Sequence, residues 1–173
     1  MLAMKLSLAV CSLIILSGCF GRDYRGGIMR YEMGRAYTGT RSFAIQSPPK
    51  PWKGPKLKYK EMVYTHDGIG GTIVTDALCG PKFEDTPVVL LAKHLFYKLD
   101  HAQIKPARYF TLDGREAVRV DGTGSMDGVP LQMQVVVMKK NFCLYDFVYF
   151  APPKSFAAGR KDFENYYQSL EAP

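Results

Sequence analysis

The sequence predicts an α+β fold in which an antiparallel β-sheet is flanked by helices. Three observations support this class: strand-like segments joined by short turns, one helix pattern in the middle of the chain, and a second that closes it. Strands linked by hairpins pair antiparallel and bury at least one apolar face, so we expect the helices to cover the sheet. The 173 residues are enough for one domain of ordinary size.

The first eighteen residues have the order of parts of a secretory signal peptide. Lys5 supplies a positive charge, residues 6–16 are almost uninterruptedly apolar, and Ser17 and Gly18 are small. The apolar run is too short for a spanning helix, which needs about 20 such residues. We therefore expect residues 1–18 to be absent from the mature protein.

Cys19 follows this segment directly. The sequence Leu16-Ser17-Gly18-Cys19 resembles the lipobox of bacterial lipoproteins, in which the cysteine is acylated, with palmitate-type chains, and the signal is cut before it. The resemblance implies lipidation of Cys19 and attachment to a membrane through its acyl chains. In that family an Asp after the cysteine retains proteins at the inner membrane; Phe20 here implies the outer membrane, facing the periplasm. The alternative is an ordinary signal with an incidental cysteine.

Residues 19–41 contain glycines, scattered arginines and no sustained helix or strand period, so they are predicted to form a tether. The folded domain is expected to span residues 42–173. Near its start, residues 47–60 are rich in proline and lysine. Proline excludes helix and central strand, so this stretch is predicted to be an extended loop.

Regular signals follow this stretch. Residues 57–65 and 71–79 have strand patterns, and glycines between them supply a turn. A helix is predicted after them, with Thr86 as its cap and Pro87 at its first position. Its apolar residues fall on one face: Val88, Leu91, Ala92, Leu95 and Leu99.

The second half of the domain alternates strands and turns. Residues 109–112 and 116–121 flank an Asp-Gly-Arg turn, and residues 131–139 follow the hairpin dipeptide Asp127-Gly128. Residues 142–150 are apolar on both faces, which predicts a central strand. The closing helix is predicted to begin near Ser155 and to present Phe156, Phe163, Tyr167 and Leu170 on one face.

This order of elements resembles the PsbP-like fold. The resemblance covers residues 42–171 and depends on Phe43 to Pro49 with Trp52, the mid-chain helix, LDGREAV, DGVPLQMQVVVMKKNFCLYDFVYFAPP and the Phe-rich closing helix. It implies an α/β/α sandwich. It also implies a binding or assembly module without catalytic activity or cofactor, and fold analogy does not identify the partner.

Cys79 ends one predicted strand and Cys143 begins another. If these strands are antiparallel neighbours, the two cysteines approach bonding distance, and an exported protein meets an oxidising compartment. Cys79 and Cys143 are therefore a disulfide candidate, and two separate buried thiols are the alternative.

Asp146 lies within an otherwise apolar strand. A carboxylate there needs a partner, so we hypothesise an internal ion pair or polar patch with Arg119 or Asp76. The alternative is a position at an edge of the sheet, facing solvent.

The proline-rich stretch combines lysines with aromatic residues. We interpret Lys50, Trp52, Lys53 and Lys56 as contacts for an acidic protein partner or anionic lipid headgroups. Nucleic acid is not expected, because an exported, anchored protein rarely meets it. A merely solvated loop is the alternative.

The sequence contains no metal-binding signature such as CxxC or HExxH, and we expect no metal and no cofactor. The favoured function is a lipid-anchored periplasmic module, without catalytic activity, that contacts an envelope protein. The alternative is a periplasmic carrier of a small apolar ligand, with a pocket between sheet and helices lined by Tyr145, Phe147 and Tyr149.

Overall fold

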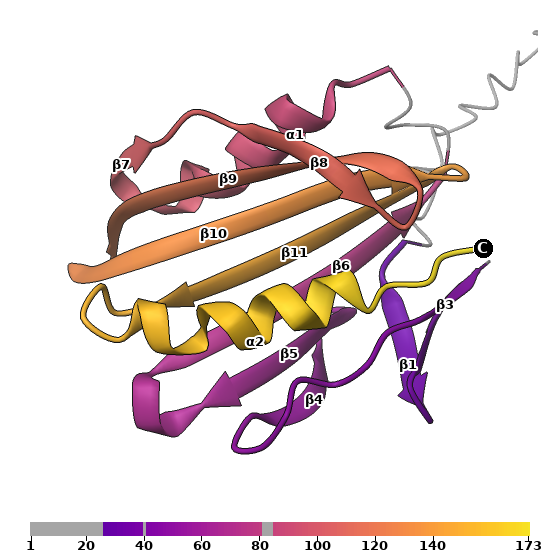
Figure 1. Cartoon of the computed structure of the whole chain (residues 1–173), viewed down its shortest axis with the longest axis horizontal. Coiled ribbons are helices and arrows are strands. Elements are labelled where there is room, and N and C mark those ends of the chain that lie inside the picture. The colour runs from indigo at the N-terminus through magenta and orange to yellow at the C-terminus, as the bar shows by residue number, and fades with distance from the viewer. Residues whose placement is uncertain (1–25, 40, 81–84) are drawn as a thin grey trace, which may run out of the picture.

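The structure is a computed structural model and describes residues 26–39, 41–80 and 85–173. Eight strands form an antiparallel sheet in the order β4-β5-β6-β11-β10-β9-β7, and β8 pairs with β9 beside that path (Figure 1). The strands are β4 Lys53–Lys58, β5 Glu61–His66, β6 Gly71–Cys79, β7 Asp100–Ile104, β8 Arg108–Leu112, β9 Arg115–Met126, β10 Val129–Lys140 and β11 Cys143–Ala151. Cys19 and the expected signal peptide lie outside the described residues.

The predicted α+β class is confirmed. Helix α1 spans Val88–His94 and continues as the 3₁₀ helix η3 over Leu95–Lys98. Helix α2 spans Phe156–Gln168, and a short 3₁₀ helix, η1 (Asp67–Ile69), joins β5 to β6. None of the helices in the described part of the chain is both long and apolar enough to cross a membrane.

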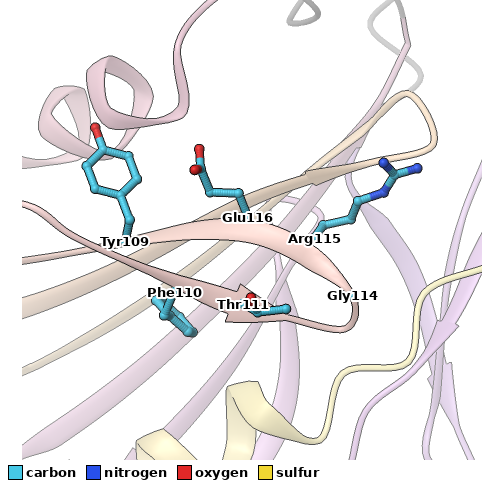
Figure 2. A pocket seen from close by; sticks show the side chains of 6 residues that line it. All are labelled: Tyr109, Phe110, Thr111, Gly114, Arg115 and Glu116. Carbon is cyan, nitrogen blue, oxygen red and sulfur yellow. The ribbon is translucent and has the colours of Figure 1, made fainter.

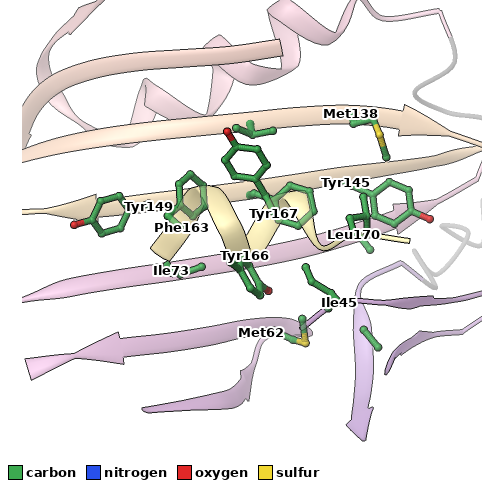
Figure 3. Packing of buried hydrophobic residues seen from close by; sticks show 14 of the residues in the cluster. Ile45, Met62, Ile73, Met138, Tyr145, Tyr149, Phe163, Tyr166, Tyr167 and Leu170 are labelled. Atoms are coloured by element: carbon green, nitrogen blue, oxygen red, sulfur yellow. The ribbon is translucent and has the colours of Figure 1, made fainter. Parts of the chain in front are cut away.

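The two helices pack against opposite faces of the sheet. On β10, Val136 and Met138 belong to a buried cluster with residues of α2, whereas Val135 and Val137 belong to another with residues of α1 and η3. This alternation follows from the two-residue period of a strand. Figure 3 shows the cluster on the α2 side, which is dominated by aromatic rings of β11 and α2.

Helix α1 is shorter than the predicted apolar stripe. After His94 the chain tightens into η3, and the fully buried side chains of this segment are Ala92 and Phe96. Phe96 packs closely over β9, where a Cβ at Gly122 would lie 2.5 Å from its Cε1 atom. The glycine in the strand is therefore required by this close approach, which periodicity alone does not reveal.

The predicted tether over residues 19–41 is wrong for its described part. Strands β1 Ile28–Glu32, β2 Arg35–Thr38 and β3 Ser42–Ala44 form a small antiparallel sheet. Ile28 and Ala36 are buried, and the Ile28 N–H donates to the Lys60 carbonyl. The strands are too short to show a period, so long-range packing rather than local pattern fixes them.

The proline-rich stretch is also more regular than predicted. Residues Lys53–Lys58 form β4, the strand at one edge of the large sheet. Pro55 is tolerated there because an edge strand leaves one row of its backbone groups unpaired.

The structure brings the two candidate cysteines together. Cys79 and Cys143 are directly opposite on β6 and β11, and a disulfide joins them with an S–S distance of 2.10 Å. The bond closes a separation of 64 residues and links two central strands near one end of the sheet.

We predict that the free energy of unfolding of the double variant Cys79→Ala, Cys143→Ala is about 4 kcal/mol lower than that of the native protein. The disulfide restricts the unfolded native chain, and the variant lacks this restriction. Urea unfolding followed by circular dichroism measures this difference. Reduction of the native protein under the same conditions should cause a similar loss. Equal stability of the oxidised protein and the double variant would contradict the role assigned to this bond.

Candidate functional site

An apolar groove lies between the sheet and the α1–η3 segment. Its volume is about 190 Å³. One acidic and one basic residue, Glu61 and Lys98, also line it. The apolar lining comes from η3, β6, β9, β10 and β11 and comprises Val74, Leu95, Leu99, Met126, Leu131, Met133, Val148 and Phe150.

The groove exists because the α1–η3 segment is too short to cover its face of the sheet. Helix α1 packs on β9 and β10. Farther across the sheet, Val74 on β6 lies opposite Val148 on β11, and both stay partly exposed. This apolar surface is therefore the part of the face on which a ligand can be bound.

Two aspartates lie next to the groove. Asp76 on β6 and Asp146 on β11 are directly opposite, two residues along their strands from Val74 and Val148. The Asp76 Oδ1 atom accepts a hydrogen bond from the Ala77 N–H at 2.7 Å. The Asp146 Oδ1 atom is buried and has no hydrogen-bond partner among the described residues.

Burial makes these carboxyl groups hard to ionise. Burial, and after it the charges of Asp76 and Glu61, together raise the pKa of Asp146 to about 7. Burial raises the pKa of Asp76 to about 6, against the effect of its bond from Ala77, and raises the pKa of Glu61 against the charge of Lys98. Two neighbouring carboxyl groups resist simultaneous ionisation, so the pair readily retains a proton near neutral pH.

The hypothesis for Asp146 is therefore half right. Asp76 is its neighbour in a polar patch, but an ion pair with Arg119 is wrong. Arg119 lies opposite Val136 on the α2 face, whereas Asp146 lies opposite Val137, which packs on the other face. The Arg119 Nε atom is instead 3.6 Å from Asp121 Oδ2.

A polar cavity of about 320 Å³ lies between α2 and the β8–β9 pair. Arg108 and Arg119 face each other across these strands, and Glu164 of α2 provides a compensating negative charge. Tyr167 lines the same cavity; burial raises its pKa, against a hydrogen bond with Arg119. The charge of the two arginines is thus offset in part by Glu164 and by Asp121, which lies near Arg119.

A surface hollow of about 310 Å³ lies farther along the β8–β9 hairpin. Tyr109 and Glu116 project to one side of the hairpin, whereas Phe110 projects to the other, toward α2 (Figure 2). Its lining side chains therefore do not converge on one point.

The predicted contact residues have different positions. Trp52 is buried, and its Nε1–H donates to Asp162 Oδ2 of α2 at 3.0 Å. A partner-contacting role for Trp52 is wrong, because the indole attaches this segment to the core. Lys50, Lys53 and Lys56 are exposed, and Lys53 forms an ion pair with Asp67.

The aromatic residues predicted to line a ligand pocket also belong to the core. Tyr145, Phe147 and Tyr149 are at most 1% exposed and lie under α2. Tyr149 donates its hydroxyl hydrogen to the Phe156 carbonyl oxygen and stacks on the Phe156 ring. The groove occupies the opposite face, whose alternate apolar residues on β6 and β11 are the sequence signal for it.

No group of three or more His, Cys, Asp or Glu side chains is placed to hold a metal ion within residues 26–39, 41–80 and 85–173. Asp76, Asp146 and Glu61 thus interact through charge and burial rather than as a ligand set.

No protein-family model matches the chain, and no curated protein does. Solved structures with similar folds include PA94 of Pseudomonas aeruginosa, a protein of unknown function. It is 14% identical with a TM-score of 0.54, over 86% of this chain and 99% of that one. LpqN, involved in cell envelope biogenesis of Mycobacterium tuberculosis, is 16% identical with a TM-score of 0.52, over 77% of this chain and 86% of its own.

The cyanobacterial PsbP protein CyanoP of Synechocystis sp. PCC 6803 is 12% identical, with a TM-score of 0.52, over 91% of this chain and 99% of its own. At these identities the similarity concerns the fold, which is therefore PsbP-like.

We predict that Asp146→Asn flattens the pH dependence of stability. An unfolded Asp has an ordinary pKa of about 4, whereas that of folded Asp146 is about 7. The folded state thus binds more protons between these values, and its stability falls as pH rises through this window. The Asn variant should gain about 4 kcal/mol over the native protein at pH 8 and almost nothing at pH 4.

Urea unfolding at pH 4, 6 and 8 measures this effect. Asp127→Asn, at an exposed turn, is the matched control for the loss of one carboxyl group. Parallel profiles for Asp146→Asn and the native protein would contradict a raised pKa at Asp146.

Proposed function

We propose that this protein is a lipid-anchored module of the bacterial envelope, at the outer membrane and facing the periplasm, that binds a protein partner and catalyses no reaction. The groove beside the α1–η3 segment is the observation that carries this proposal. It combines an apolar lining with neighbouring carboxyl groups on a face that the described helices cover only in part. Such a surface is suited to recognition.

The groove also indicates the chemistry of the partner. Its volume of about 190 Å³ is below the range of about 300–1,000 Å³ that encloses small-molecule ligands. It therefore receives one or two apolar side chains of a protein segment. Even with one proton retained on the Asp76–Asp146 pair, this pair and Glu61 carry more negative charge than Lys98 carries positive charge, which favours a basic residue next to the apolar ones.

A carrier of a small apolar ligand is the second candidate. The observation that favours it is the apolar lining, which extends over five elements. If the protein is a carrier, its ligand occupies the same groove on the α1 face. The crosslinking experiment below distinguishes a bound ligand from a protein partner.

The sequence and the fold support the location. The Leu16-Ser17-Gly18-Cys19 segment provides an attachment point, and several acyl chains on one cysteine would hold the protein at a membrane. LpqN, which has a similar fold, is involved in cell envelope biogenesis. Helices on both faces of the sheet support the α/β/α sandwich form of the PsbP-like fold.

We predict that acylation and membrane location both depend on Cys19. In a Gram-negative host the native protein should fractionate with the outer membrane and show a mass increment of acyl size on a chain that begins at residue 19. Cys19→Ala should lack the increment and leave the outer membrane fraction. A native protein without acyl chains would refute the anchor.

We predict that a photo-crosslinking residue in place of Leu95 captures one discrete protein in living cells, because Leu95 lines the groove. Leu90 is the matched control, since it lies on the same helical segment and points to solvent, 56% exposed. Glu61→Lys should abolish the adduct by reversing the charge beside the groove. A lipid-sized adduct would support the carrier instead, and identical adducts from both positions would refute binding in the groove.

A further inference from the structure

Two hairpin turns have residues that their backbone conformation disfavours. Both central residues have positive φ in five turns of the described chain: Met33-Gly34, Tyr59-Lys60, Asp113-Gly114, Asp127-Gly128 and Asn141-Phe142. Asn-Gly and Asp-Gly suit such turns, because the left-handed region is costly for residues with a bulky side chain. Three turns have glycine second, but the others place Tyr59 at φ 50° and Phe142 at φ 64°.

Burial does not offset this cost. The side chain of Tyr59 is 97% exposed and that of Phe142 is 60% exposed. An aromatic residue that gains no core packing, at a position where glycine or asparagine would be more stable, indicates a binding role outside the domain.

The two aromatic residues lie at the same end of the sheet. Phe142 directly precedes β11, where Cys143 pairs with Cys79, and Tyr59 directly precedes Lys60, whose carbonyl accepts the Ile28 N–H. Figure 1 shows the β10–β11 turn, the start of β1 and the C-terminus at this end. The Asp127-Gly128 turn lies at the other end, because β9 and β10 run the length of the sheet.

This end is also the one that the N-terminal segment reaches. Seven residue steps join Cys19 to Gly26, a path of about 25 Å at most when fully extended. Strand β9 has 12 residues and is therefore about 40 Å long. A chain attached to a bilayer at Cys19 thus holds the end with Tyr59 and Phe142 closer to the lipid than the opposite end.

Two lysine side chains lie beside the exposed aromatic residue Tyr59. Tyr59 lies between Lys58 and Lys60, and both lysines are exposed. Aromatic side chains are favoured at the membrane–water interface, and lysines beside them are attracted to anionic headgroups.

We infer that this end of the sheet, formed by Tyr59, Phe142, Lys58 and Lys60, contacts the surface of the membrane to which the protein is anchored. The inference rests on the proposed acylation of Cys19. It assigns to the lysine-rich stretch a function at Lys58 and Lys60, away from the buried Trp52. Contact at this end also sets the orientation of the groove relative to the membrane.

The test uses the full acylated protein with an environment-sensitive NBD fluorophore on one introduced cysteine. The positions are Tyr59→Cys, Phe142→Cys and the control Asp127→Cys at the opposite end. The protein is reconstituted in phosphatidylcholine vesicles containing phosphatidylglycerol, with or without spin-labelled quencher lipid. We expect a blue shift and at least twofold quenching at positions 59 and 142, neither at 127, and weaker quenching without phosphatidylglycerol.

The outcomes separate this inference from the anchor. Acylated protein with equal signals at all three positions overturns the membrane contact and leaves the anchor intact. Protein without acyl chains, shown by intact mass of the same sample, refutes the anchor and the inference together.

A double variant tests whether the aromatic residues at these turns lower the stability of the protein and contact the membrane. Tyr59→Asn with Phe142→Gly places favoured residues at the two turns, so the Tm should rise by a few degrees. The same protein, labelled at Lys58→Cys, should lose at least half of the lipid quenching that Lys58→Cys alone shows. A rise in Tm with unchanged quenching would overturn the role assigned to the aromatic residues.

Discussion

The structure depends on one constraint, which is that strand β11 has apolar side chains on both faces. Tyr145, Phe147 and Tyr149 project to one side, and Leu144, Asp146 and Val148 to the other. A strand of this kind is stable only in the middle of a sheet with a cover on each face. β6 and β10 therefore become its neighbours, and α1 and α2 pack on opposite sides.

The two covers are unequal, and this inequality produces the candidate site. Helix α2 has 13 residues and seals its face with stacked and edge-on aromatic rings. Helix α1 has seven and ends in a 3₁₀ turn over β9 and β10. Part of the second face is left with apolar side chains that lie at its surface, next to two carboxyl groups that are costly to ionise. A face covered in this way leaves apolar surface available for the proposed partner, at the expense of stability.

Hairpin turns at the two ends of the large sheet also differ. At the far end of the sheet, where the chain only has to reverse, the Asp127-Gly128 turn meets the left-handed geometry with little strain. Where the N-terminal segment joins the sheet, the turns display Tyr59 and Phe142 instead.

The sequence by itself determined the α+β class and most of the large sheet. The strand over residues 71–79, the hairpin at Asp127-Gly128, the central strand after Phe142 and the helix after Ser155 were all predictable, because period and turn chemistry are local properties. The pairing of Cys79 with Cys143 was predictable only as one of two alternatives. Only the tertiary structure decided the rest, which depends on contacts between distant residues.

Three short strands near the N-terminus form by packing on residues far along the chain, as when Ala44 bonds to Glu171. Trp52 lies among lysines in the sequence, which predicted a surface position, but its side chain is buried against His66 and Tyr149 and its Nε1–H donates to Asp162. Asp146 is opposite Asp76 rather than beside Arg119, because strand register selects the face on which each side chain lies. Periodicity shows that a strand has two apolar faces, and only the lengths and positions of the covering helices decide which face remains open.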